Sequence, residues 1–70
     1  MKRNQHEGRS LAKRRRMLGL TQHELSRLTD IPVSRVVFIE TGRTSPEQFE
    51  LDRIRHVFRR RAQKAMSVCA

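Results

Sequence analysis

The histidines and the cysteine are the side chains best suited to metal binding or nucleophilic catalysis. His6, His23 and His56 lie far apart in the sequence, and Cys69 is the only cysteine. No two of them have the spacing of a metal-ligand set or of a nucleophile with its base. The sequence therefore predicts no enzyme activity, no metal site and no cofactor.

Arginine and lysine are the more informative groups, because together they give the chain a formal net charge of +9. Residues 1–20 hold seven basic side chains and one acid, residues 21–46 hold three of each, and residues 47–70 hold six basic and three acidic. Such a surface attracts nucleic acid or an anionic membrane. A membrane-surface helix needs a long apolar face, and no segment has one. Nucleic acid is therefore the predicted partner. The N-terminus lacks a signal-peptide pattern, so a cytoplasmic location is predicted.

Helices must position these side chains, because no stretch alternates apolar and polar residues as a strand does. The first predicted helix carries Leu11 and Leu18 on one face and ends at Gly19. Its start is open between two suitable N-caps, Asn4 and Ser10.

The next two predicted helices are short, and only about three residues, 30–32, separate them. Thr21 and Glu24 have the spacing of a capping box, and Pro32 suits the first turn of the following helix. The inward residues are Leu25, Leu28 and Thr29 in one helix and Val36, Ile39 and Glu40 in the other. So short a connection makes the two helices meet at a steep angle, as in a helix-turn-helix unit.

A fourth helix is predicted with Ser45 as its cap and Pro46 at its first position, and Leu51, Ile54 and Phe58 form its apolar face. Seventy residues allow one small domain. We assign residues 8–61 to that domain, residues 1–7 to a basic arm, and residues 62–70 to a tail that either extends the last helix or frays.

The segment from Thr21 to Ser26, followed by Ile39–Arg43 and Pro46, resembles the phage-repressor and Cro-type helix-turn-helix family. The spacing matches without a gap, and the resemblance covers roughly residues 8–58. It implies an all-α, lambda-repressor-like bundle of four to five short helices. It also implies a bacterial or phage-encoded transcriptional regulator that reads the major groove of double-stranded DNA with residues 33–41, as a repressor.

Arg15 shares a helix face with Leu11 and Leu18, and Glu40 shares one with Val36. An unpaired buried charge is very costly, so we predict an Arg15–Glu40 salt bridge between the first and third helices. The resembled family has such a pair at matching positions. The alternative is that both side chains extend to the surface.

The outward residues of the predicted helix 33–41 are the candidates for contact with bases. By resemblance, Val33, Ser34 and Phe38 match base-reading positions, Gln22 matches a phosphate anchor, and Thr41 with Arg43 matches a backbone-contacting loop. Arg35 alone can bind guanine with two hydrogen bonds, and its alternatives are a phosphate contact or a solvated charge. Phe38 can touch only apolar groups of DNA, or it packs in the core or in a dimer interface. Specificity is then expected to rest partly on DNA shape.

The basic flanks are expected to supply affinity that does not depend on sequence. Lys2, Arg3 and Arg9 are predicted to run along the DNA backbone, and Arg59–Arg61 either bind phosphate or form a solvated helix end. Regulators of one such domain usually bind palindromes in pairs, so a homodimer is predicted. The alternative function is an antitoxin or accessory regulator that binds a protein partner such as a toxin, through the exposed apolar residues Val37, Phe38, Met66 and Val68.

Overall fold

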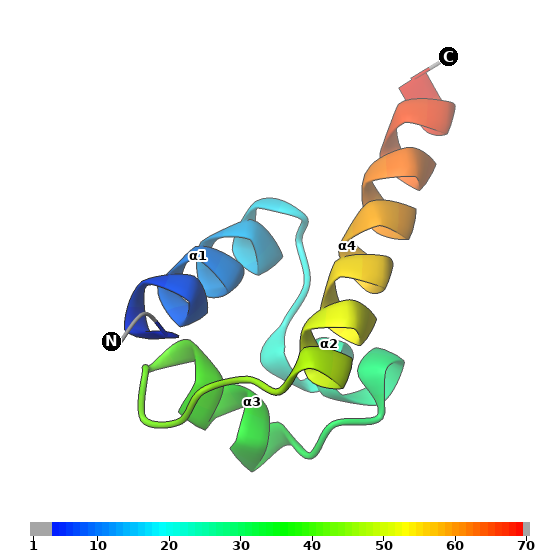
Figure 1. The fold of residues 1–70 in the computed structure, drawn as a ribbon. Helices are drawn as coiled ribbons and strands as arrows, with labels where there is room; N and C mark the ends of the chain where they lie inside the picture. Colours follow the sequence, from blue (N-terminus) through cyan, green and yellow to red (C-terminus); the bar gives the residue numbers. More distant parts are fainter. Residues whose placement is uncertain (1–3, 70) are drawn as a thin grey trace.

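The computed structural model describes the backbone of residues 4–69 and the side chains of residues 7–64. In this range the chain forms four helices, α1 (Asn4–Met17), α2 (Gln22–Thr29), α3 (Val33–Glu40) and α4 (Gln48–Cys69), and no strand (Figure 1). The all-α fold class is confirmed. Residues 4–7 belong to α1, residues 62–69 extend α4, and Lys2 and Arg3 lie outside the described residues.

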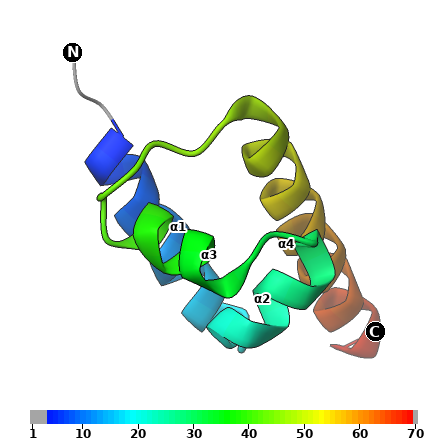
Figure 2. The ribbon, with the colours of Figure 1, turned by 90° about the horizontal axis from the view of Figure 1, so that it is seen from below.

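The two short helices are joined as their end signals predict. The capping box at the start of α2 is complete, since the Glu24 N–H donates to Thr21 Oγ1 at 3.0 Å and the Thr21 N–H donates to Glu24 Oε1 at 2.9 Å. Asp30 ends α2 in the left-handed conformation, with φ 64°. Ile31 then turns into the core, and Pro32 precedes the first residue of α3. Seen from below, α2 and α3 lie next to each other at the front of the molecule and run in different directions (Figure 2).

One apolar core holds the helices together, and every helix contributes to it. Its members are Leu11, Leu20, Leu25, Ile31, Val36, Ile39, Leu51, Ile54 and Phe58. Leu28 was predicted to point inward, and this is wrong, because 57% of its surface is exposed. The buried stripe of α2 is centred between Leu25 and Thr29, and at 3.6 residues per turn Leu28 lies about 80° from that centre.

The start of α4 also differs from the predicted one. The helix begins at Gln48, and residues 45–47 are a loop. The Glu50 carboxylate accepts from the Glu47 N–H at 2.9 Å, so the first-turn contact is made two residues later than predicted. This segment also has a long-range contact that the local pattern does not show, since Arg35 of α3 donates to the Ser45 carbonyl at 3.3 Å.

Gly8 sets the distance between α1 and α3. A Cβ atom at this position would lie 2.0 Å from the Ile39 carbonyl oxygen, far inside any allowed contact. Glycine therefore lets the two backbones approach closely, as the absence of a side chain permits. This close approach brings the C-terminal half of α1 to the end of α3, where Arg15 and Glu40 meet.

Candidate nucleic-acid interface

The predicted ion pair between Arg15 and Glu40 is present and buried. Arg15 Nε donates to Glu40 Oε2 at 2.7 Å and Nη2 donates to Oε1 at 3.1 Å, with side-chain exposures of 9% and 6%. Arg15 Nη1 also donates to the Leu20 carbonyl at 2.8 Å. These exposures rule out the surface alternative, and the pair fixes α1 against the C-terminal end of α3.

Gln22 is a third member of this network. Its Nε2 atom donates to Glu40 Oε1 at 3.0 Å, so a side chain at the first turn of α2 is oriented by the last residue of α3. Sequence reasoning assigned Gln22 to DNA and missed this bond, because the pattern of types and spacings does not say which way a glutamine amide turns. The bond holds Gln22 at the junction of the two helices.

The outer face of α3 carries the other predicted contact residues. Ser34, Phe38 and Thr41 are exposed, and Val33 and Val37 are half-buried beside them. No residue of this face carries a charge, so it offers hydroxyl groups and apolar surface. The cap residue Pro32 makes no side-chain hydrogen bond to the helix. The first N–H groups of α3 are therefore available to an acceptor such as a phosphate oxygen.

Phe38 and Arg43 lie together at the edge of this face. The Arg43 guanidinium carbon is 5.4 Å from the centre of the Phe38 ring, the geometry of a cation–π contact. Phe38 is 44% exposed, so it is not part of the core. The Arg43 N–H donates to the Phe38 carbonyl at 2.9 Å, which ties the loop after α3 to the helix.

Arg35 lies apart from these contact residues, turned toward α4. Its Nε and Nη2 atoms donate to the two oxygens of Glu50, each at 2.8 Å. Nη1 donates to Thr44 Oγ1 at 3.1 Å, and Nη2 reaches the Ser45 carbonyl at 3.3 Å. The Arg35 guanidinium, which was a candidate for binding guanine, thus makes four hydrogen bonds within the protein. The sequence pattern does not distinguish this orientation, because an arginine at this position can extend either toward DNA or toward α4.

The electrostatics of this pair are clear from its surroundings. Hydrogen bonds from Arg35 and the Glu47 N–H lower the pKa of the Glu50 carboxyl, against the opposing effect of burial. The hydrogen bonds to Glu50 raise the pKa of Arg35. Both groups are therefore charged at neutral pH, and Glu50 of α4 neutralises the charge of Arg35 on α3.

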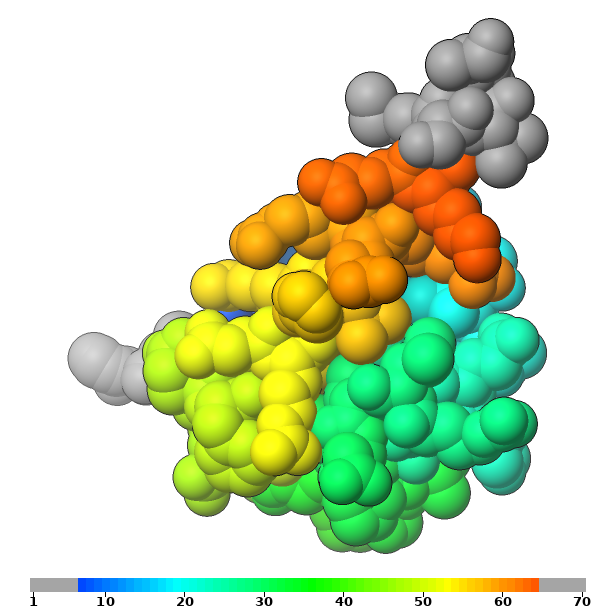
Figure 3. Space-filling view, turned by 90° about the vertical axis from the view of Figure 1, so that its right-hand side faces the viewer, coloured from blue at the N-terminus to red at the C-terminus, as the bar shows by residue number. Residues whose placement is uncertain are grey.

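Besides Arg43 at the edge of α3, the described chain carries exposed basic residues on α1 and α4. In Figure 1 α3 is at the lower edge of the molecule, and the C-terminal half of α4 points to the opposite, upper side. Arg59, Arg60 and Lys64 are on that half of α4 and Arg9 is on α1, all of them exposed. Figure 3 faces α4, whose orange end stands above the surface of the other helices.

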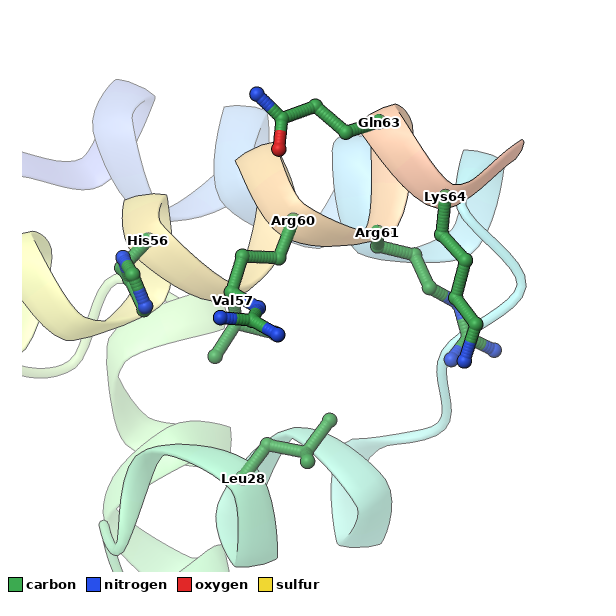
Figure 4. Close-up of a pocket in the computed structure, with 7 residues that line it drawn as sticks. All are labelled: Leu28, His56, Val57, Arg60, Arg61, Gln63 and Lys64. Carbon is green, nitrogen blue, oxygen red and sulfur yellow. The ribbon is translucent and has the colours of Figure 1, made fainter. Parts of the chain in front are cut away.

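A groove lies between α2 and this half of α4, with a volume of about 820 Å³ (Figure 4). Leu28 points into it from α2, and Val57 lies on the opposite wall. Its rim is basic and polar, with His56, Arg60, Arg61, Gln63 and Lys64. Leu28 is 57% exposed, so one apolar side chain lies beside a cluster of cations in this groove.

Among the side chains that the structure describes, those of residues 7–64, no group of three or more His, Cys, Asp or Glu is arranged to bind a metal. None of the described helices is long and apolar enough to cross a membrane.

The steep helix pair, the uncharged outer face of α3 and the basic surface around it together define a helix-turn-helix protein. Comparison with protein families agrees, since the helix-turn-helix family model matches residues 11–64, most of the chain. The chain belongs to this family, of the phage-repressor and Cro type, and is a DNA-binding helix-turn-helix regulator. Comparisons with curated proteins and with solved structures gave no match.

Proposed function

We propose that this protein is a transcriptional repressor that binds specific sites in double-stranded DNA, with α3 in the major groove. The observation that carries the proposal is the exposed and uncharged outer face of α3, flanked by Gln22 and Arg43. A recognition helix reads base edges with the exposed side chains of its outer face, and hydroxyl and apolar groups are among those that can do so. Ser34 supplies a hydroxyl, and Val33 and Phe38 supply apolar contacts for thymine methyl groups. Thr41 can only accept, because its hydroxyl donates to the Val37 carbonyl at 2.9 Å.

Phosphate contacts in this proposal come from residues around the reading face. Gln22 and Arg43 anchor the backbone on either side of α3, and Arg9 adds charge from α1. Such contacts give affinity without sequence information and make binding strongly dependent on salt. The reading face then contributes modest base discrimination, and sequence-dependent DNA shape contributes the rest.

A mobility-shift titration tests this function, with DNA from upstream of the protein's own gene and an unrelated duplex of equal length. The titration is repeated at several salt concentrations. The expected result is a specific complex that survives at salt concentrations where the unrelated duplex is released. Equal binding of both duplexes at low salt would refute the proposed specificity, and no binding to either would refute the DNA-binding role.

We further propose that the repressor acts as a homodimer in the cytoplasm of a bacterium or a phage-infected cell. One domain of this size covers a single half-site, and paired half-sites one helical turn apart are read by two-fold symmetric dimers. Sedimentation equilibrium, with and without an operator duplex, measures the stoichiometry. A complex with one protein chain per operator would refute the dimer.

A second candidate function, that of an antitoxin or accessory regulator, is favoured by the groove of Figure 4. The occupant that fits it is an acidic amphipathic helix of a partner protein, since its rim is cationic and Leu28 offers an apolar anchor. A second copy of this basic chain fits less well, because it would place like charges together.

A synthetic helical peptide with glutamates on one face and leucines on the other probes this groove by calorimetric titration. Loss of a buried leucine contact costs about 1.5–3 kcal/mol, so Leu28→Ser should weaken binding by about tenfold or more. Met17→Ser is the matched control, since Met17 is 76% exposed and is not among the residues that line the groove. Equal peptide affinity for wild type and Leu28→Ser would show that charge alone attracts the peptide, and would refute the groove as a docking site.

A further inference from the structure

The Arg35–Glu50 pair is a forked polar contact that the proposed function does not use. The two side chains meet through two parallel hydrogen bonds of 2.8 Å, the fork geometry that makes arginine–carboxylate pairs strong. Two further bonds, to Thr44 and Ser45, join Arg35 to the loop between α3 and α4. The contact therefore connects the recognition helix, the following loop and the last helix.

Releasing Arg35 toward DNA would leave Glu50 in an unfavourable state. The Glu50 side chain is only 6% exposed, and its other contact in the domain is the Glu47 N–H. A carboxylate that loses its cationic partner in such a place keeps the cost of burial without the attraction that offset it. A phosphate or guanine contact must exceed this cost before Arg35 leaves Glu50.

We propose that Glu50 is a specificity-determining residue and that Arg35 is a positioning residue, which does not contact DNA. Glu50 holds the guanidinium on the inner side of α3 and so keeps the reading face free of a mobile cation. A free arginine there would add affinity for any duplex, because it binds phosphate regardless of sequence. This inference rests on the proposed function.

The same pair orders the loop that presents Arg43. The Arg43 and Thr44 N–H groups both donate to the Phe38 carbonyl, at 2.9 and 3.3 Å, while the Thr44 hydroxyl is held by Arg35. Loss of Glu50 therefore loosens these two amides in the free protein. This effect can be measured without any DNA.

The test compares wild type with Arg35→Gln and Glu50→Gln in salt titrations on an operator duplex and on a mixed-sequence duplex. Each phosphate contact contributes a slope of about 0.9 in a plot of log affinity against log salt. We expect Arg35→Gln to leave the slope unchanged. Glu50→Gln should steepen it by about 0.9 on both duplexes and lower the ratio of specific to non-specific affinity at least threefold.

Asp52→Asn is the matched control, because it removes the same charge from an exposed position of α4 whose carboxylate contacts only Gln48. It should leave the slope as in wild type. Arg35→Lys is a second variant, which keeps the charge and loses the fork. Because a lysine still pairs with Glu50 through one contact, its salt slope should lie between those of wild type and Glu50→Gln.

Hydrogen exchange of the free proteins completes the test. The Arg43 and Thr44 amides should exchange at least fivefold faster in Glu50→Gln than in Asp52→Asn. Equal exchange would overturn the inference, whatever the protein does with DNA. A slope that falls by about 0.9 in Arg35→Gln, with lost preference at one G·C pair, would also overturn it. If wild type binds no duplex, the proposed function fails, and the exchange measurement still decides whether Glu50 orders the loop.

Discussion

Gly8→Ala offers the sharpest test of how the domain is assembled, because two physical effects predict opposite signs. Alanine in place of glycine inside a helix normally stabilises it by about 1 kcal/mol. At Gly8 the new Cβ would lie 2.0 Å from the Ile39 carbonyl oxygen, whereas real Cβ atoms essentially never approach within 3.0 Å. The obstacle is backbone, so no side-chain rotation relieves it, and α1 must move by at least about an ångström.

The magnitude follows from what that displacement disturbs. Overpacking of a core costs about 1–3 kcal/mol, occasionally more. The shift also strains the Arg15–Glu40 pair, whose shortest bond is 2.7 Å and which joins the same two helices. After subtraction of the helix-propensity gain, we expect a net loss of about 2 kcal/mol. For a domain of this size, that lowers the melting temperature by about 8–16 °C.

Thermal and urea unfolding followed by circular dichroism at 222 nm measure this loss, with two controls. Ser10→Ala lies on the exposed side of the same helix and should raise stability slightly. Gly19→Ala meets no atom within 4 Å, but its φ of +74° is a left-handed conformation, so it should cost about 1 kcal/mol. A Gly8→Ala protein as stable as Ser10→Ala would refute the close approach of α1 and α3.

Three further predictions concern the charged and capping contacts. Arg15→Ala strands the Glu40 carboxylate and should cost about 3–5 kcal/mol in urea unfolding, and a double-mutant cycle with Glu40→Gln should recover part of this as coupling energy. Arg35 lowers the pKa of Glu50 in the folded protein below its ordinary value of 4.5, so on acidification the unfolded chain binds a proton at this carboxyl before the folded one does. The stability that the pair contributes above about pH 4.5 is therefore lost as the pH falls through the lowered pKa. The urea midpoint of wild type should therefore fall more between pH 5 and pH 3 than that of Glu50→Gln, and parallel curves would contradict the pair's role. Thr21→Ala removes one bond of the capping box and should cost about 1 kcal/mol by the same assay, whereas an unchanged midpoint would show that the cap contributes nothing.

The short-range features of the fold were predictable from sequence because local physics decides them. The capping box of α2 and the left-handed end at Asp30 depend on residues within a few positions of one another. The Arg15–Glu40 pair connects distant residues, yet it was predictable because each charge shared a face with core residues and needed a partner. Because both charges are buried, pairing with each other avoids the cost of an unpaired buried charge.

The parts that could not be predicted depend on distant competition for the same groups. Ser45 and Pro46 form a good local start signal for a helix, but Arg35 takes the Ser45 carbonyl and α4 begins later. Leu28 has the spacing of an inward residue, but a helix of two turns buries only the narrow stripe that its neighbours contact. In both cases the local pattern allowed several outcomes, and a contact from another helix selected one.

The two ion pairs have a joint consequence for recognition. α3 contains two charged residues, Arg35 and Glu40, and each is neutralised by a partner from a different helix. Glu40 is held by α1 and Arg35 by α4, so the recognition helix is fixed from both sides by forked, largely buried contacts. A helix held in this way loses little freedom on docking, and rigid support of a contact surface sharpens discrimination between similar ligands. Substitutions in the basic flanks should therefore change affinity for all duplexes alike, whereas substitutions in the two pairs should lower the ratio of specific to non-specific affinity, even though neither pair touches a base.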